Sequence, residues 1–356
     1  MEPMYGPPPP PPDYGGYGAL PGYGPHYGLR PLAPGAVRPG IIPLRPMTLS
    51  DIFNGAAGFI RANPKATLGL TALVVVAMQI ISLLATLGPL AALGRSMPEQ
   101  PDELSLGMVS AWLASLAASL LVAWLGSMLL SGVLTVIIGR AVFGSPITIG
   151  ETWARIRGRL LPLLGLALLE AAVVAAFGGL VVLFIAVLTA TGNGPVAVVL
   201  GLPVVVAVIA LAVYLYTVVL FAPVLVVLER LTVGSAIARS FALVRNGFWR
   251  VLGIRTLAFI VTAAVANALA VPFNIVGQIL MRGTPSSGVL LAGTALASIG
   301  SAIGQIITAP FNAGVIVLLY TDRRMRAEAF DLVLQTGAAG GPDTTASADH
   351  LWLIRP

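Results

Sequence analysis

Six long runs of apolar residues constrain this chain more than any other feature of its sequence. They cover roughly residues 66–93, 107–139, 160–190, 196–228, 251–281 and 288–320. A helix needs about 20 apolar residues to cross the hydrocarbon core of a bilayer, and each run meets that length. Only 10% of the 356 residues are charged, whereas a typical soluble domain carries about 25%. We therefore expect an all-α integral membrane protein with six transmembrane helices.

The positions of the basic residues predict how these helices are oriented. Of the 20 Lys and Arg residues, 17 precede the first run, follow the last run, or lie between runs two and three or runs four and five. The remaining connections hold only Arg95 and Arg282. Because cytoplasmic loops are enriched in Lys and Arg, both termini are expected in the cytoplasm. The composition, rich in Arg and Ala, is typical of a bacterial protein, so we expect a multi-pass protein of the plasma (inner) membrane.

The same placement explains the formal charge of +6. Basic residues at the ends of membrane helices contact anionic lipid headgroups, and these lipids are the partners we expect. A nucleic-acid partner is not needed to account for the charge.

Proline divides the chain into a tail and a membrane domain. Residues 1–46 hold 14 of the 28 prolines and five of the eight tyrosines, and they contain no aliphatic run. Such a composition cannot form a packed core, so we expect a disordered cytoplasmic tail. It is either a solvated tether or an arm that binds a cytoplasmic protein. Residues 47–335 are expected to form the six-span domain, ending in an amphipathic helix over 322–334, and residues 336–356 a second disordered cytoplasmic tail.

Similar segments precede runs one, three and five. They open at Thr48, Thr148 and Thr232, where a threonine can cap a helix. Apolar residues follow at helical spacing, with arginines on the remaining face: Ile52, Phe59 and Ile60; Trp153, Ile156 and Leu160; Ile237, Phe241 and Val244. These patterns predict amphipathic helices in the cytoplasmic interface, each followed by a helical hairpin, and hence three repeats. The alternative is that every hairpin needs a basic entrance and that the likeness goes no further.

Three motifs resemble a known family. They are LRPMTLSDIF at 44–53, APVLVVLE at 222–229 with AIARSF at 236–241, and LLYTDRRMRAEAFDL at 318–332. They are similar to motifs of uncharacterised bacterial membrane proteins related to the membrane domain of glycerophosphoryl diester phosphodiesterase. The last motif is the most specific because it is polar and dense. The resemblance covers about residues 44–335 and implies an integral membrane protein, without an activity for the membrane domain alone.

Phosphodiesterase chemistry is not expected in this chain. That chemistry needs histidines as acid and base and a carboxylate cluster that holds a divalent metal. The only histidines are His26 and His350, both in the tails, and there is no cysteine. We therefore expect no enzymatic activity, no catalytic residues, no metal and no cofactor.

Two ionisable residues inside the runs form the first candidate site. Glu170 lies about 15 Å beyond the entrance of the third span at Arg159, and Arg255 lies five residues beyond Arg250 in the fifth. Ionisable groups inside a membrane are costly and usually mark function. The two could form a proton or cation relay or a site for a lipid headgroup. We favour a structural role, either as a pair or with a protonated Glu170 and an Arg255 that extends to the interface.

Polar and small residues inside the runs add further candidates. Asn267, Asn274 and Gln278 fall near one face of the fifth span and predict a polar seam or a permeation path. Small residues predict close helix packing, within the chain or between copies, and we favour the former. They are Ser115, Ser119 and Ser127 in the second span and Gly300 and Gly304 in the sixth.

Two functions remain open. The first is a non-enzymatic membrane scaffold or envelope-homeostasis component that recruits partners through residues 1–46. The alternative is a transporter or channel for a small or lipidic solute that uses Glu170, Arg255 and the polar faces of spans five and six. A deep, polar-lined cavity containing Glu170 would favour the alternative, and a filled bundle would favour the scaffold.

Overall fold

A computed structural model describes residues 42–43, 45–93, 106–143, 147–190, 194–282, 287–339 and 351–353. All of them belong to one compact unit over residues 38–356. The described residues form helices and their connections, with no strand among them. The predicted disorder of residues 1–41, 340–350 and 354–356 lies outside the described residues.

Among the described residues, six helices are long and apolar enough to cross a membrane, which confirms the six predicted spans. The long helices are α2 (Pro64–Leu93), α3 (Leu106–Val142), α5 (Leu160–Ala190), α6 (Gly194–Val219), α9 (Phe248–Met281) and α10 (Ser287–Glu328). The fourth run is divided, because α6 ends and a short helix, α7 (Ala222–Leu228), begins with Pro223 in its first turn. Proline fits there because an N–H in the first turn of a helix has no partner to lose.

The last helix is longer than predicted. α10 continues to Glu328, and Ala329 ends it with a φ of 50° before α11 (Phe330–Ala339) begins. The prediction of a single helix over 322–334 is therefore wrong. The first half of this segment is the end of α10, and the second half belongs to α11. No proline or glycine interrupts residues 315–328, so nothing in the sequence stops α10 at the predicted position.

Short helices precede spans one, three and five, where the threonine motifs lie. They are α1 (Leu49–Ala62), α4 (Ile149–Ile156) with the 3₁₀ turn η1 (Arg157–Arg159), and α8 (Val233–Arg245). Thr48 and Thr148 each form a capping box with the acid three residues later, in which side chain and backbone bond reciprocally. Thr232 has no acid at that distance, and its hydroxyl instead lies 2.7 Å from that of Ser235.

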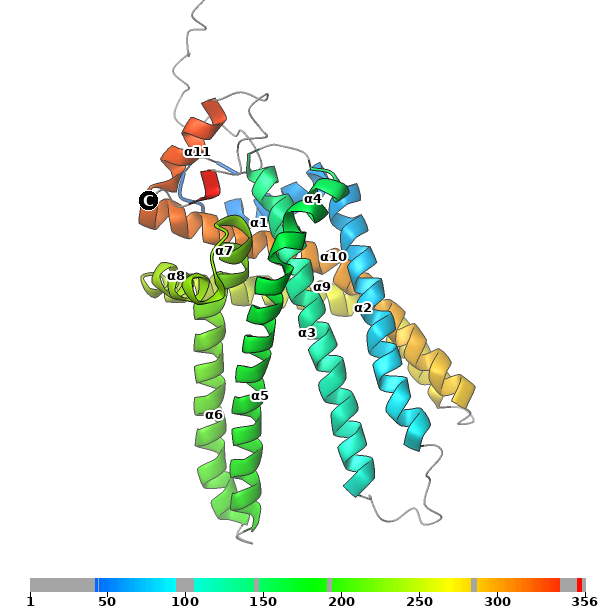
Figure 1. The fold of residues 1–356 in the computed structure, drawn as a ribbon. Helices are drawn as coiled ribbons and strands as arrows, with labels where there is room; N and C mark the ends of the chain where they lie inside the picture. The colour runs from blue at the N-terminus through cyan, green and yellow to red at the C-terminus, as the bar shows by residue number, and fades with distance from the viewer. Residues whose placement is uncertain are drawn as a thin grey trace, which may run out of the picture. The chain divides into compact units, whose positions relative to one another are not determined.

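Consecutive long helices pack as the pairs α2–α3, α5–α6 and α9–α10. Figure 1 shows these pairs diverging from a shared end that also holds α1, α4, α7, α8 and the last turns of α10. We call this end the base. The fully buried apolar side chains concentrate there, in the last turns of α3, in α7, and in residues 315–320 of α10.

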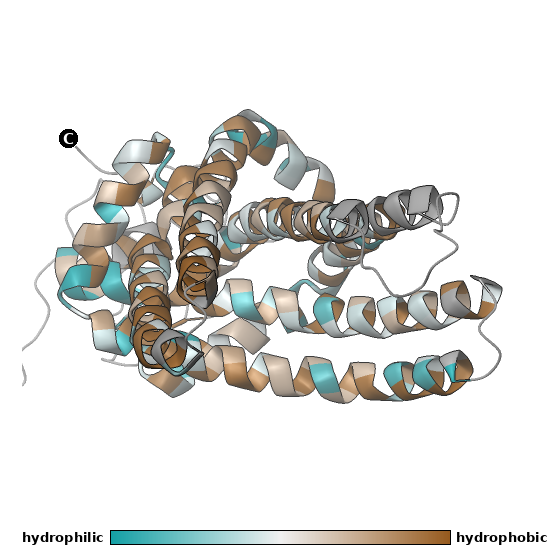
Figure 2. Ribbon diagram, turned by 90° about the horizontal axis from the view of Figure 1, so that it is seen from below, coloured by the Kyte–Doolittle hydropathy of each residue, from teal (hydrophilic) through white to brown (hydrophobic). Residues whose placement is uncertain are grey.

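Away from the base, the long helices expose apolar side chains. Leu183, Val199, Leu202 and Ile209 of α5 and α6 are each more than half exposed, and Figure 2 shows hydrophobic residues over most of the long helices. A lipid phase can cover such apolar surfaces. Because a helix satisfies its own backbone hydrogen bonds, these helices do not need a protein neighbour on every side.

The short helix α1 differs from the predicted interfacial helix. Ile52, Ala56 and Phe59 are fully buried, and α1 packs on α10. At Gly314 of α10, a Cβ would lie 2.6 Å from the Phe59 ring, so the glycine leaves room for it. The apolar face of α1 is thus covered by protein and not free to enter lipid, whereas Trp153 of α4 and Phe241 of α8 remain exposed.

Candidate functional site

The first polar cluster of the base surrounds Glu229, which follows α7. Its side chain is fully buried. It accepts hydrogen bonds from Arg239 of α8 and, at 2.6 Å, from the Tyr320 hydroxyl of α10. Arg324 Nη1 of α10 lies 3.5 Å from the same carboxylate. A buried carboxylate is tolerated only when charges and hydrogen bonds compensate its lost hydration, and these donors come from two other helices. Glu229 therefore ties α7 to α8 and α10.

Glu328 extends this cluster to the surface. Its carboxylate lies 2.8 Å from Arg239 Nη2 and 3.0 Å from Arg324 Nε. Burial lowers the pKa of Arg239, but the bonds to Glu229 and the charge of Glu328 more than offset it, so the pKa of Arg239 is raised. Arg239 thus remains charged between two acids, and Arg324 lies between the same two carboxylates. We call Glu229, Arg239, Tyr320, Arg324 and Glu328 the Glu229 cluster.

The second polar cluster surrounds Asp322, whose side chain is also fully buried. Asp322 Oδ1 accepts from the Met47 backbone N–H at 2.8 Å and from Arg326 Nε at 3.0 Å. Asp322 Oδ2 accepts from Arg250 Nε of α9 at 3.2 Å. Both arginines also donate to the Met47 carbonyl, at 2.7 and 3.1 Å. This Asp322 cluster fixes the start of α1 against α9 and α10.

Two more contacts complete the base. Arg323 Nε donates to the Leu243 carbonyl of α8 at 3.0 Å, and its guanidinium occupies the space where a Cβ of Gly247 would lie. Trp352 is buried beside Phe143 and Phe330, with ring centroids 5.6 and 5.2 Å away. Arg324 donates to its carbonyl at 3.1 Å. Residues 351–353, assigned from sequence to the C-terminal tail, thus pack on the base.

Sequence reasoning noted the polar motif at 318–332 but missed the burial of its charges. The available signal was position: Glu229 and Asp322 each stand at the end of an apolar run, in a chain with only 14 acidic residues. An acid placed there either meets solvent or is covered by a neighbouring segment. Which of these occurs depends on tertiary contacts such as those of Met47 and Tyr320, which lie far away in sequence.

The structure does not bring Glu170 and Arg255 together. Arg255 donates to the Tyr216 hydroxyl of α6 through Nε and Nη2, at 3.2 and 3.0 Å, and to Asn312 Oδ1 of α10 through Nη1 at 2.9 Å. Glu170 is half-buried in α5 and has no hydrogen bond or ion pair with any other described residue. Its helix contacts α3 and α6 most closely, whereas α9 contacts α10, α6 and α8.

The three amides predicted to form a seam do not bridge helices in the described part of the chain. Asn267 donates to the Ala263 carbonyl of its own helix at 2.8 Å, and Asn274 and Gln278 have no hydrogen bond to another described residue. Other residues make polar links between α9 and α10, among them Asn312 Nδ2, which donates to the Thr262 hydroxyl at 3.2 Å, and Arg255, which donates to Asn312 Oδ1.

The predicted small-residue stripes occupy two different settings. A Cβ at Gly300 would lie 2.7 Å from Phe273 Cβ, and one at Gly304 would lie 3.1 Å from the Ala266 carbonyl oxygen, so both glycines face α9. In α3, Ser127 donates to the Trp124 carbonyl of its own helix at 2.8 Å. Ser119 is half-buried, and the buried Ser115 hydroxyl has no hydrogen-bond partner among the described residues.

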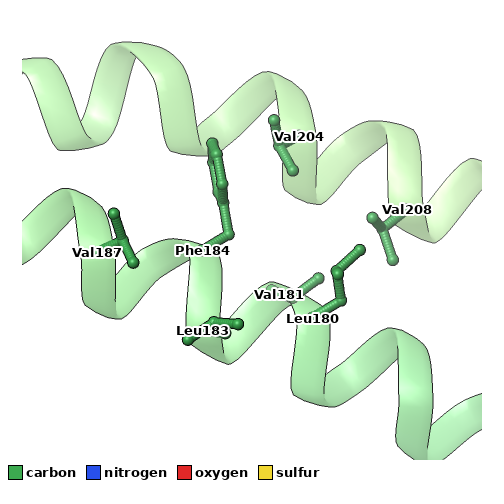
Figure 3. A pocket seen from close by; sticks show the side chains of 7 residues that line it. All are labelled: Leu180, Val181, Leu183, Phe184, Val187, Val204 and Val208. Atoms are coloured by element: carbon green, nitrogen blue, oxygen red, sulfur yellow. The ribbon is translucent and has the colours of Figure 1, made fainter.

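A pocket of about 320 Å³ lies between α5 and α6. Figure 3 shows that its lining side chains carry no polar atoms: Leu180, Val181, Leu183, Phe184, Val187, Val204 and Val208. Such a pocket can receive an apolar group but offers no acid, base or ligand for a metal. In the described part of the chain, no three His, Asp or Glu side chains lie close enough to hold a metal ion.

Residues 47–323 match the model of a protein family described as a domain of unknown function, DUF7847. The matched segment runs from Met47 to Arg323 and so includes Met47, Arg250 and Asp322 of the Asp322 cluster, but not Arg326. No curated protein and no solved structure matches the chain.

Proposed function

This chain belongs to the DUF7847 family, and we propose that it is a non-enzymatic membrane scaffold of the bacterial envelope. One observation carries the proposal: the buried charges connect helices to one another. Asp322 and Glu229 join the segment before α1 and the end of α7 to α8, α9 and α10. The arginines around them donate to groups of the base itself, which suits a protein whose task is to present segments in a fixed arrangement.

The proposal places the base at the cytoplasmic face of the plasma membrane. The uneven distribution of basic residues supports this orientation, with both termini in the cytoplasm. The three short helices with their following helix pairs are taken as three hairpin repeats, supported by the matching capping boxes at Thr48 and Thr148. Exposed Trp153 and Phe241 would then meet lipid headgroups from α4 and α8.

The partner-binding element in this proposal is the Pro- and Tyr-rich N-terminal tail. Ile42 and Met47 are buried, and the Met47 backbone is held by Asp322, Arg250 and Arg326. The tail would therefore leave the base from a fixed point, as an arm for a cytoplasmic protein partner. Kinship with the membrane domain of glycerophosphoryl diester phosphodiesterase stays a prediction that rests on the three motifs.

The test is affinity capture from native membranes with the full chain and with a chain that lacks residues 2–41. This deletion spares Ile42 and Met47, so the base keeps its contacts. A matched variant changes Tyr5, Tyr14, Tyr17, Tyr23 and Tyr27 to Ser. We expect a defined set of cytoplasmic proteins that the full chain retains and the deletion loses, with equal melting temperatures. Identical captured sets would contradict recruitment by the tail.

Transport is the alternative function, and one observation favours it. Arg255, Asn312 and Thr262 form a polar chain inside spans five and six. Purified protein in sealed vesicles should then release an imposed ion or solute gradient, and Glu170→Gln or Asn312→Ala should reduce the rate. Vesicles that hold the gradient as well as protein-free vesicles would exclude this alternative for the solutes tested.

A further inference from the structure

Arg255 stands apart from the arginines that hold the base. Arg239, Arg250, Arg324 and Arg326 each pair with a carboxylate. Arg255 lies five residues deeper along α9 than Arg250, about 8 Å along the helix axis, and pairs with no carboxylate of the described residues. Its hydrogen-bond partners, Tyr216 and Asn312, are neutral. A positive charge at this depth in an apolar helix therefore lacks a compensating anion from the described part of the protein.

The partners of Arg255 hold its guanidinium in place. Thr262 donates to the Ala258 carbonyl at 2.8 Å and accepts from Asn312 Nδ2 at 3.2 Å. This arrangement fixes the orientation of the Asn312 amide, so that its oxygen faces Arg255 Nη1 at 2.9 Å. On the other side, the Tyr216 hydroxyl accepts from Nε and Nη2. The guanidinium is thus held between α6 and α10 and is not extended freely toward the membrane surface.

Two hydrogen-bond donors of the Arg255 guanidinium remain unused by the described residues. A guanidinium has five N–H groups, and Tyr216 and Asn312 take one each from Nε, Nη1 and Nη2. One N–H on Nη1 and one on Nη2 remain, which is the pair that binds a phosphate with two parallel hydrogen bonds. The Tyr216 hydroxyl accepts from Arg255 and keeps its own hydrogen to donate.

The surroundings are open and suit a lipid. Tyr216 is 47% exposed, and Phe259, one turn deeper than Arg255 on the same face of α9, is 59% exposed. Toward the base, Trp249 is 81% exposed, and Tyr and Trp side chains concentrate where headgroups meet acyl chains. A phosphate at Arg255 would thus have apolar surface for acyl chains on one side and interfacial aromatic side chains on the other.

We propose that Arg255, Tyr216 and Asn312 form a binding site for the phosphate group of an anionic phospholipid, with Arg255 and Tyr216 donating to the phosphate and Asn312 orienting the guanidinium. The site joins α6 to the α9–α10 pair, so the bound lipid would lie where the α5–α6 pair meets the α9–α10 pair. This site rests on the proposed scaffold function, since it specifies one lipid that the scaffold binds, but it does not involve residues 1–46. A failure here leaves the capture experiment unaffected.

The experiment measures lipid binding to the purified full chain in detergent by native mass spectrometry. The probes are phosphatidylglycerol, diacylglycerol with the same acyl chains but no phosphate, and inorganic phosphate. We expect Arg255→Gln to weaken phosphatidylglycerol binding about tenfold or more, since two charge-assisted hydrogen bonds are lost. Arg245→Gln is the matched control: it removes the same charge from an exposed arginine of α8 and should leave binding within about twofold.

Tyr216→Phe keeps the site testable if Arg255→Gln does not fold. It removes one donor and should weaken phosphatidylglycerol binding about threefold while diacylglycerol binding stays unchanged. Wild-type affinity for phosphatidylglycerol in folded Arg255→Gln or in Tyr216→Phe would overturn the proposal. Displacement of the lipid by an equal concentration of inorganic phosphate would overturn the assignment to a lipid and identify a free phosphate as the ligand.

Discussion

The helices of the base and those of the spans are held in contact in two different ways. In the base, two fully buried carboxylates bind donors from segments far apart in sequence: Asp322 pairs with Arg250, and Glu229 accepts from Tyr320. In the described spans away from it, α9 and α10 meet through glycines, with the Gly277 Cα facing the Gly293 carbonyl and Gly300 facing Phe273. Buried charge fixes partners, whereas small residues only permit close approach.

This difference predicts how each region responds to substitution. Removing one member of a buried charge network leaves the others unpaired, and the cost is large. Adding a methyl group at a close glycine forces a local shift, and the cost is smaller. A polar group without a partner should matter least.

The largest effect is expected from Asp322→Asn. The substitution leaves Arg250 and Arg326 without their carboxylate and should lower the free energy of unfolding by about 4 kcal/mol. Thermal unfolding in detergent, followed by size-exclusion chromatography, measures this loss. Asp331→Asn, the same change in α11 at a residue outside both clusters, should cost less than about 1 kcal/mol. Equal losses for the two variants would mean that the burial of Asp322 does not increase its contribution to the free energy of unfolding.

A loss of about 3 kcal/mol is expected from Glu229→Gln, because Arg239 and Arg324 then lose their buried acid. The comparison variant is Glu328→Gln, in the same cluster but 30% exposed. It should cost about 1 kcal/mol or less, since solvent screens its charge. The same unfolding assay ranks the two variants. A larger loss for Glu328→Gln would contradict the prediction that the more buried acid contributes more to stability.

A moderate effect is expected from Gly300→Ala. The new Cβ would lie 2.7 Å from Phe273 Cβ, so α9 and α10 must separate, at a cost of about 2 kcal/mol. Gly178→Ala in α5 is the control, because a Cβ there meets nothing within 4 Å. That variant should be neutral or slightly more stable. If both substitutions were neutral, the inference that α9 and α10 are in close contact at Gly300 would be wrong.

The smallest effect is expected from Glu170→Gln. Because Glu170 has no hydrogen bond or ion pair with another described residue, its loss should change the free energy of unfolding by less than about 0.5 kcal/mol. A loss comparable to that of Glu229→Gln would show that Glu170 has a partner in the folded protein and that the spans also depend on buried charge.

The helices themselves could be predicted from sequence, and their polar contacts could not. Apolar length alone gives the six spans, and threonine followed by an acid three residues later marks the starts of α1 and α4. These signals are local. The partners of Glu229 and Asp322 lie up to 275 residues away, and hydrophobic periodicity carries no information about which segments meet.

Arg255 shows the same limit inside the spans. Its depth along α9 follows from counting residues, and so does that of Glu170. The choice of partner depends on which helices are neighbours, and α9 packs against α6, α8 and α10. Opposite charge suggested Glu170, but Tyr216 and Asn312 are the residues within reach.

The most direct test is a double-mutant cycle between Glu229→Gln and Tyr320→Phe. Glu229 follows α7 and Tyr320 lies in α10, and the two side chains share a 2.6 Å hydrogen bond. The account predicts a coupling free energy of about 1.5 kcal/mol in unfolding experiments, because a buried charge-assisted bond is lost only once. Tyr216→Phe, at a separate site, should combine additively with Glu229→Gln to within about 0.5 kcal/mol. Additive losses for Glu229 and Tyr320 would contradict the claim that buried charge at the base joins α7 to α10.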